Sequence, residues 1–412
     1  MAANSNAVTM EKRSSMMQIV PVMMCFFAMG FVDLIGTAKD YVQNDFGLSE
    51  SLAGWLPSIV FFWFFVISVP TGLLMNKIGR KKTVLLSLIV TTLALVLPIC
   101  GPEKNGNADF ALIIIGFCLL GIGNAIMQTS LNPLVSNLIS NDKLASTLTF
   151  GQFIKAIASA ITPLMVAWGA TEAIPTFGHS WKGFMAIYAI ISFLSIAVLA
   201  ATPIKEEKPD KASSIWQSIK LLGAPFIFLC FIGIFCHVGI DVGTNTYGKK
   251  ILMDSQNLGP EAELVVYTTI LYFIFRLAGT FIGAFLLRLM SQKLFFFISV
   301  LMMIAAMVIF FTCSSVGAIY TGIALVGFGN SNIFAIVFSQ ALEAKPKERN
   351  EVSGLMIMGL VGGAAFSGVM GYAYELFGGI AGAIAVISVG VLYLLYFTTN
   401  IRKPNQVAED VD

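Results

Sequence analysis

The chain has 412 residues, of which 57% are hydrophobic and only 12% are charged, and its formal net charge is +2. A soluble domain carries about 25% charged residues, so this composition excludes a set of soluble domains and predicts an integral membrane protein. The six cysteines form no C-x-x-C pair, and the sequence holds no Ser/His/Asp arrangement, metal-ligand cluster or phosphate loop. We therefore expect no enzyme activity, no catalytic residue, no metal, no cofactor and no nucleic-acid partner.

Apolar runs of membrane length recur along the whole chain. A helix needs roughly 20 apolar residues to cross about 30 Å of hydrocarbon, and twelve runs reach or nearly reach that length. The sequence thus predicts an all-α membrane protein with twelve transmembrane helices in a lipid bilayer. In chain order the predicted spans are 16–38, 52–75, 83–100, 110–139, 145–170, 182–202, 222–248, 263–288, 294–313, 316–342, 351–376 and 379–399.

The placement of the basic residues predicts the orientation, because cytoplasmic segments carry an excess of Lys and Arg. If the N-terminus is cytoplasmic, 18 of the 25 basic residues lie on the inner side, five on the outer side and two, Lys155 and Arg276, inside spans. Both termini are therefore predicted to be cytoplasmic, in an inner or plasma membrane. The outer set is Lys39, Lys104, Lys182, Lys249 and Lys250; the inner set is Lys12, Arg13, Lys77, Arg80, Lys81, Lys82, Lys143, Lys205, Lys208, Lys211, Lys220, Arg288, Lys293, Lys345, Lys347, Arg349, Arg402 and Lys403.

A repeated pattern divides the chain into two halves. The run 121–124, GIGN, in the fourth span recurs 206 residues later as 327–330, GFGN, in the tenth. The longest polar interior segment separates six spans from six, so we predict an N-terminal half over 1–204, a cytoplasmic linker over 205–220 and a C-terminal half over 221–412. Parallel six-span repeats are a transporter architecture, with the substrate between the halves near the bilayer midplane.

The end of the linker places four apolar residues on one helical face: Ile215, Trp216, Ile219 and Leu222. This spacing predicts a short helix lying on the inner membrane surface.

Residues 72–82, GLLMNKIGRKK, resemble the G-x-x-x-D-R/K-x-G-R-K/R-K/R loop of the major facilitator superfamily and lie between spans two and three, as in that family. The resemblance implies the major facilitator fold, with two pseudo-symmetric six-helix halves. It also implies a role for Gly72, Asn76, Gly79 and Arg80 in conformational change. Asn76 stands where the family has Asp, which weakens the charge relay attributed to this loop.

Within that superfamily the chain resembles the L-fucose–proton symporter group. Residues 235–242, FCHVGIDV, look like its F-x-Y-V-G-x-E-V in span seven, and residues 148–155, LTFGQFIK, look like its L-N-x-A-Q-x-F-N in span five. Residues 121–133 hold its G-x-G and N-P elements. The resemblance implies a secondary active transporter that takes up a monosaccharide or sugar acid with a proton, by alternating access.

The chain departs from the group at four positions. At the group's acidic position in span one, Asp33 is only the nearest carboxylate. Gln128 occupies the position of the group's proton-carrying Glu and cannot titrate. Lys155 replaces its span-five Asn. Thr280 replaces its span-eight Arg, with Arg276 one turn earlier.

Four ionisable residues lie within predicted spans: Asp33, Lys155, Asp241 and Arg276. Each such charge costs on the order of 2.5–3.5 kcal/mol, so we expect them to face the central cavity or to pair with one another. A desolvated carboxylate binds a proton near neutral pH, which makes Asp33 and Asp241 candidates for proton coupling. Asp33 is alternatively a helix cap or a partner of Lys39.

His237 is the third candidate for proton coupling, because histidine titrates near neutral pH. It stands four residues before Asp241 and so shares a helix face with it. A proton relay through the two side chains and a buried histidine satisfied by the aspartate are equally open.

Amide side chains within spans are the candidate substrate ligands, since they donate and accept hydrogen bonds without charge. Gln152 ranks first, because it matches a sugar-contact position of the resembled group. Lys155 and Arg276 would add contacts to an anionic sugar, so the substrate charge stays open. The predicted substrate-binding set is Gln128, Asn132, Gln152, Lys155, Asn245, Arg276 and Asn330.

Other functions remain as alternatives. Uptake of a different small organic anion is one, and sodium coupling is not excluded. Drug efflux is disfavoured because span five lacks the G-x-x-x-G-P-x-x-G-G pattern of drug antiporters. A membrane sensor is disfavoured because no soluble signalling domain is visible in the sequence.

Overall fold

The computed structural model describes residues 18–101, 106–171, 180–204, 206, 214–259 and 262–402, and every regular element in these ranges is a helix. Twelve helical segments in the described residues are long and apolar enough to cross a membrane. The predicted fold class is therefore confirmed. Seven basic residues used for the orientation lie outside the described residues: Lys12, Arg13, Lys104, Lys205, Lys208, Lys211 and Lys403.

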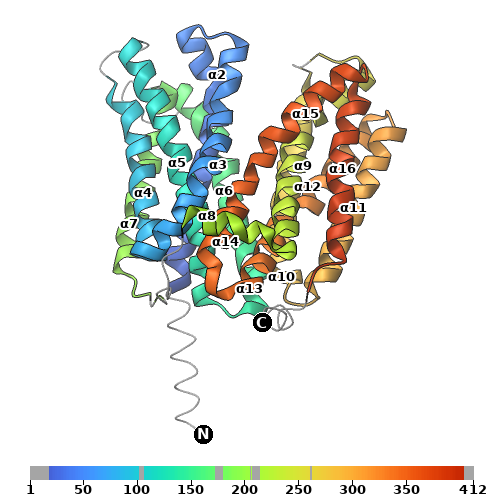
Figure 1. Ribbon diagram of the computed structural model, residues 1–412. Helices are drawn as coiled ribbons and strands as arrows, with labels where there is room; N and C mark the ends of the chain where they lie inside the picture. Colours follow the sequence, from blue (N-terminus) through green and yellow to red (C-terminus); the bar gives the residue numbers. More distant parts are fainter. Residues whose placement is uncertain are drawn as a thin grey trace, which may run out of the picture. The chain divides into compact units, whose positions relative to one another are not determined.

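The chain forms two compact units (Figure 1). The first comprises residues 1–140 and 154–215, and the second comprises residues 141–153 and 216–412. One helix, α6 (Asn141–Ala170), therefore has its first 13 residues in the second unit and the rest in the first. The division into halves at 205–220 remains a proposal.

The first unit consists of long helices joined by short 3₁₀ turns. A helix over residues 18–29 precedes the turn η1, and α4 packs against both α5 and α7, while α3 packs against α5. Its elements are η1 (Gly30–Asp33), α2 (Leu34–Phe46), α3 (Glu50–Ile78), α4 (Arg80–Val96), η2 (Leu97–Cys100), α5 (Asn107–Leu138), the later part of α6, η3 (Ser180–Lys182) and α7 (Met185–Ala201).

The second unit is organised around α9 (Pro225–Gln256), which α10, α12, α13, α15 and α16 all contact. Because neighbours surround α9, polar side chains on it lie in the interior of the unit. The other elements are α8 (Ile215–Lys220), η4 (Leu221–Gly223), α10 (Glu263–Leu286), α11 (Gln292–Thr312), α12 (Val316–Asn330), α13 (Ile333–Ala344), η5 (Pro346–Glu348), α14 (Arg349–Met358), η6 (Gly359–Val361), α15 (Gly362–Leu376) and α16 (Ile380–Thr398).

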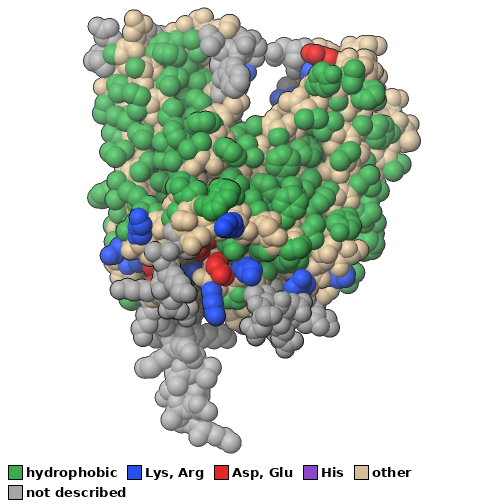
Figure 2. Space-filling view, in the orientation of Figure 1, with side chains coloured by type: hydrophobic (Ala, Val, Ile, Leu, Met, Phe, Trp, Pro, Cys, Tyr) green, Lys and Arg blue, Asp and Glu red, His purple; other side chains and the backbone are tan. Residues whose placement is uncertain are grey.

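Large apolar side chains cover the outward faces of these helices. Figure 2 shows hydrophobic side chains over most of the visible face, with Lys and Arg gathered near its lower edge. Phe193 on α7 and Val389 on α16 are 62% and 67% exposed, which fits contact with lipid tails rather than water. On α8, Ile215, Trp216 and Ile219 are 51%, 65% and 37% exposed, so the predicted short helix is present. Its contact with a membrane surface stays a prediction.

Three of the membrane-spanning segments are interrupted. The first is broken by η1, the tenth by the turn at Ser331 and Asn332 between α12 and α13, and the eleventh by η6. An interruption exposes backbone carbonyls, which a membrane protein tolerates only where they are buried in protein or line a watery cavity.

A buried ion pair joins the ends of two spans in the first unit. The Lys182 ammonium lies 2.7 and 2.9 Å from the two carboxylate oxygens of Asp109, and the two side chains are 9% and 1% exposed. Lys182 was predicted to lie in an outer segment, and its burial was not foreseen. Because each charge is compensated by the other, the pair can be buried without leaving either unpaired.

Candidate functional site

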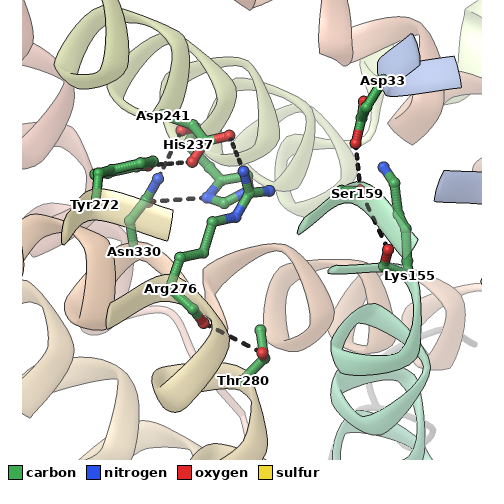
Figure 3. Close-up of polar contacts among 9 residues, drawn as sticks. All are labelled: Asp33, Lys155, Ser159, His237, Asp241, Tyr272, Arg276, Thr280 and Asn330. Atoms are coloured by element: carbon green, nitrogen blue, oxygen red, sulfur yellow. Dashed lines mark hydrogen bonds and ion pairs between the residues drawn. The ribbon is translucent and has the colours of Figure 1, made fainter. Parts of the chain in front are cut away.

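In the second unit, an ion pair crosses from α9 to α10. A carboxylate oxygen of Asp241, Oδ2, lies 2.8 Å from the Arg276 guanidinium, and the Tyr272 hydroxyl donates to the other oxygen, Oδ1 (Figure 3). Tyr272 stands one turn before Arg276 on α10, so the two side chains share a face. The expectation that charges within spans pair with one another holds for Asp241 and Arg276.

His237 engages α12 through Asn330 (Figure 3). The Asn330 amide Nδ2 donates to the backbone carbonyl of His237 over 3.1 Å, so its Oδ1 faces the ring and accepts from His237 Nδ1 at 2.8 Å. This arrangement favours the tautomer that carries its proton on Nδ1. Both side chains are buried, and Asn330 is the last residue of α12 before the interruption.

In the first unit, Asp33 ends the turn η1 and is exposed. The desolvation predicted from its apolar sequence surroundings is therefore wrong in this structure, in which the Asp33 side chain is exposed. Ser159 on α6 donates to Asp33 Oδ2 (Figure 3). The Lys155 ammonium points toward the same carboxylate, while the Lys155 carbonyl lies 3.1 Å from the Ser159 hydroxyl.

Gly30 allows η1 to approach α6 closely. A Cβ atom at this position would come within 2.7 Å of the Lys155 carbonyl oxygen and of Ala158 Cβ. Any larger residue would push the turn, and with it Asp33, away from Ser159.

The two units repeat one local arrangement. In the first, Asn124 Nδ2 donates to the Met29 carbonyl over 3.3 Å; in the second, Asn330 Nδ2 donates to the His237 carbonyl. Asp33 and Asp241 each stand four residues after the carbonyl that accepts this bond. The two carboxylates within spans therefore occupy equivalent places in the repeat, a correspondence that the GIGN and GFGN runs alone did not indicate.

Two of the remaining predicted amides bond within α5. Gln128 Nε2 donates to Asn124 Oδ1 at 3.1 Å, and Asn132 Nδ2 donates to the Gln128 carbonyl at 2.7 Å. Asn132 Oδ1, Gln152 Nε2 and Asn245 Oδ1 are buried atoms without a hydrogen-bond partner among the described residues. Thr269 Oγ1 on α10 is also a buried atom without a hydrogen-bond partner among the described residues, and the sequence analysis did not single it out.

The loop between α3 and α4 binds a carboxylate of the linker. The backbone N–H of Arg80 donates to Glu206 Oε2 over 2.9 Å, and that of Lys81 donates to Oε1. Gly79, with φ +92°, occupies the left-handed region just before α4. The Arg80 guanidinium donates to Asn137 Oδ1. Glu206 thus supplies a carboxylate to the same loop in which Asn76 replaces the usual Asp.

Two further positions were singled out in the sequence. Gly72 is buried within α3. The Thr280 hydroxyl is hydrogen-bonded to backbone carbonyls of α10, at 2.9 Å from that of Leu277 and 3.2 Å from that of Arg276.

Comparison with known proteins agrees with this architecture. The sequence profile described as Major Facilitator Superfamily matches residues 22–368. A glucose/galactose transporter of Brucella abortus is 25% identical over 355 residues, covering 82% of this chain and 83% of the relative. The L-fucose-proton symporter of Escherichia coli strain K12 is 21% identical over 367 residues, covering 82% of each protein.

Solved structures share the fold at low identity. The crystal structure of FucP in the outward conformation has a TM-score of 0.79 at 17% identity, covering 95% of this chain and 100% of FucP. The proton:xylose symporter XylE, bound to 6-bromo-6-deoxy-D-glucose, has a TM-score of 0.75 at 14% identity, covering 95% of this chain and 97% of XylE. Since the family profile spans most of the sequence, this chain belongs to the Major Facilitator Superfamily of transporters.

Proposed function

We propose that this chain is a proton-coupled symporter that takes up a neutral monosaccharide by alternating access. The observation that carries the proposal is the Asp241–Arg276 pair at 2.8 Å. Since Asp241 already compensates the guanidinium, Arg276 does not require an anionic substrate. In the first unit, Lys155 likewise points toward Asp33 (Figure 3).

Uncharged hydrogen-bonding groups are available for a sugar. The buried atoms Gln152 Nε2, Asn245 Oδ1 and Thr269 Oγ1 lack partners among the described residues. A buried polar atom without a partner costs about 1–3 kcal/mol, so a hydroxyl-rich ligand would recover that energy on binding. The names of the relatives, glucose/galactose transporters and an L-fucose-proton symporter, support the same substrate class.

The ion pair would also couple proton binding to sugar binding. Protonation of Asp241 would remove its attraction for Arg276, and the guanidinium would then turn its donors to a sugar oxygen. Tyr272 would remain beside the carboxyl group as a hydrogen-bond partner. Proton and sugar would therefore favour the same rearrangement. His237 and Asp33 are the further proposed proton-binding groups.

The test is uptake of glucose, galactose and fucose into proteoliposomes, with and without a pH gradient. Asp241→Asn should abolish gradient-driven accumulation while exchange of substrate persists, because exchange needs no net proton movement. Asp33→Asn should do the same if Asp33 carries a proton. Glu263→Gln, at an exposed carboxylate in the first turn of α10, is the matched control and should accumulate normally. Parent-like accumulation by both aspartate variants would contradict proton carriage.

An acidic sugar remains the second candidate, because Lys155 stands at the position where the resembled group has Asn. Competition between glucose and glucuronate for uptake, in the parent and in Lys155→Asn, separates the two substrates. If glucuronate competes better in the parent and loses that advantage in Lys155→Asn, the substrate is anionic and the neutral-sugar proposal fails.

We further propose cytoplasmic termini in a plasma or inner membrane. The 18 basic residues assigned to one side support this orientation. Labelling of a cysteine added at either terminus, in intact against permeabilised cells, tests it.

A further inference from the structure

A cavity of about 230 Å³ lies in the second unit, where the turn between α10 and α11 meets the chain that follows α16. Its lining combines apolar side chains with two cations and one carboxylate. The lining includes Asp142, Leu287, Met290, Lys293, Ile401 and Arg402. None of these residues belongs to the site described above, so the cavity is a separate feature of the unit.

A buried glutamine joins the two segments that carry the cations. Gln340 of α13 is completely buried. Its Nε2 donates to Gln292 Oε1 over 2.9 Å and to the Arg402 carbonyl over 3.0 Å, and its Oε1 accepts from the Arg402 backbone N–H over 3.0 Å. These bonds fix the chain after α16 to the start of α11. The backbones of Lys293 and Arg402 are therefore held at one cavity.

Both cations can bind an acceptor in the cavity. The Arg402 guanidinium carbon lies 4.4 Å from the centre of the Phe226 ring. Stacking uses the face of a guanidinium, whereas its N–H groups donate in the plane, so an anion can be bound without breaking this contact. Lys293 is exposed, and its ammonium donates to the Thr399 carbonyl over a long distance of 3.4 Å. A phosphate oxygen would be a stronger acceptor, because a hydrogen bond between two charged groups is stronger than one to a neutral carbonyl.

The charged side chains of the cavity sum to one positive charge. Lys293 and Arg402 contribute two, and Asp142, exposed at the start of α6, removes one. Nearby, Arg288 is exposed on the turn after α10, and Glu343 of α13 is 1% exposed and does not line the cavity. A phosphodiester carries one negative charge and would balance the sum.

Apolar side chains beside the cavity face outward. Leu289, in the turn between Leu287 and Met290, is exposed, as are Leu294 and Ile298 on α11. Outward-facing apolar side chains on a membrane-spanning helix fit contact with lipid tails. A ligand with its phosphodiester in the cavity and hydrocarbon chains outside it would satisfy both surfaces.

We propose that this cavity binds the headgroup of a phospholipid with one net negative charge, such as phosphatidylglycerol. Lys293 and Arg402 bind the phosphodiester, and the acyl chains lie against Leu289 and the outward face of α11. The cavity is on the side proposed to be cytoplasmic, where basic pockets between helices bind anionic headgroups. The site is independent of the substrate and of the coupling ion.

The experiment measures phosphatidylglycerol binding to the full chain by native mass spectrometry, after equilibration in nonionic detergent micelles. Loss of one cation beside a lipid phosphate weakens binding about fivefold. Lys293→Gln should therefore raise the apparent Kd about fivefold, and Lys293→Gln/Arg402→Gln about 25-fold. Because Lys293 is exposed, the single variant should fold as the parent does. Lys347→Gln removes an exposed cation of η5 outside the cavity, so this matched control should keep the parental Kd.

Three further measurements identify the ligand. Asp142→Asn removes a charge of the same sign as the lipid and should lower the Kd for phosphatidylglycerol. Phosphatidylethanolamine, which has no net charge, should bind more weakly than phosphatidylglycerol. Inorganic phosphate, which has no acyl chains, should not displace the lipid at equal concentration.

Four results would overturn the proposal. The first is an equal rise of the Kd in Lys293→Gln and Lys347→Gln, which would show that the cavity is not the binding site. The second is a higher Kd for phosphatidylglycerol in Asp142→Asn. The third is binding of phosphatidylethanolamine as tight as that of phosphatidylglycerol, and the fourth is displacement of the lipid by inorganic phosphate at equal concentration.

Discussion

Neutralising one member of the Asp241–Arg276 pair should destabilise the protein more than neutralising both. In Arg276→Gln, the Asp241 carboxylate remains in a side chain that is only 16% exposed, with Tyr272 as its donor. Breaking a buried ion pair costs about 3–5 kcal/mol, and partial solvent access places this case at about 3 kcal/mol. In Asp241→Asn, the residue left behind is Arg276, which is 32% exposed, so the cost should be about 2 kcal/mol.

The assay is reversible unfolding in mixed micelles titrated with a denaturing detergent, carried through a double-mutant cycle. The double variant Asp241→Asn/Arg276→Gln leaves no unpaired charge and should lie within about 1 kcal/mol of the parent. Lys293→Gln, which removes an exposed ammonium, is the control and should change stability by less than about 0.5 kcal/mol. If the losses of stability in the two single variants simply add in the double variant, the two side chains do not interact energetically. The proposed coupling of proton and sugar binding through this ion pair is then refuted.

Three further changes test other parts of the site. Gly79→Ala should cost about 1–3 kcal/mol in the same unfolding titration, because the backbone is at φ +92° and the new Cβ would clash with Glu206 Oε2; unchanged stability would contradict this. Gln152→Ala and Asn245→Ala should each raise the glucose concentration needed for half-maximal uptake about five- to tenfold, the value of one hydrogen bond. Neither should lower stability, whereas Asn124→Ala should, since it breaks the bond to Met29. Gly72→Leu, at a buried position in α3, should lower the transport rate with little change in glucose affinity; a large loss of affinity at an unchanged rate would argue against a conformational role.

The helices themselves were predictable because length and hydropathy alone decide whether a segment can cross a bilayer. The first and last segments, predicted at 16–38 and 379–399, are found at Gln18–Gly36 and Ile380–Thr398. Their interruptions were not predictable in the same way. The turn η1 depends on the close approach of Gly30 to α6, and that approach is a tertiary contact between residues more than 120 positions apart.

The site was predictable as a set of residues but not as a set of partners. The cost of charge in a membrane indicates that Asp241 and Arg276 need compensation, and this follows from sequence. Helix periodicity then favoured His237 as the neighbour of Asp241, whereas the structure brings Tyr272 and Arg276 to Asp241 and Asn330 to His237. The sequence did contain an indication that Tyr272 belongs to the site, since it precedes Arg276 by one turn on the same face of α10.

Glu343 and Asp109 had no comparable signal. Both lie near the ends of apolar runs, where a carboxylate is normally solvated, and only the packing of distant helices buries them. Local sequence cannot report such burial, because it depends on which other helix ends cover the position.

The buried Asp109–Lys182 pair has a consequence for biosynthesis. The two residues are 73 positions apart, so at about 5–20 residues per second Asp109 leaves the ribosome roughly 4–15 seconds before its partner. During that interval the fourth helix has an aspartate without its lysine, and the bundle cannot bury it at low cost. The first unit can therefore bury Asp109 at low cost only after its sixth helix has been inserted.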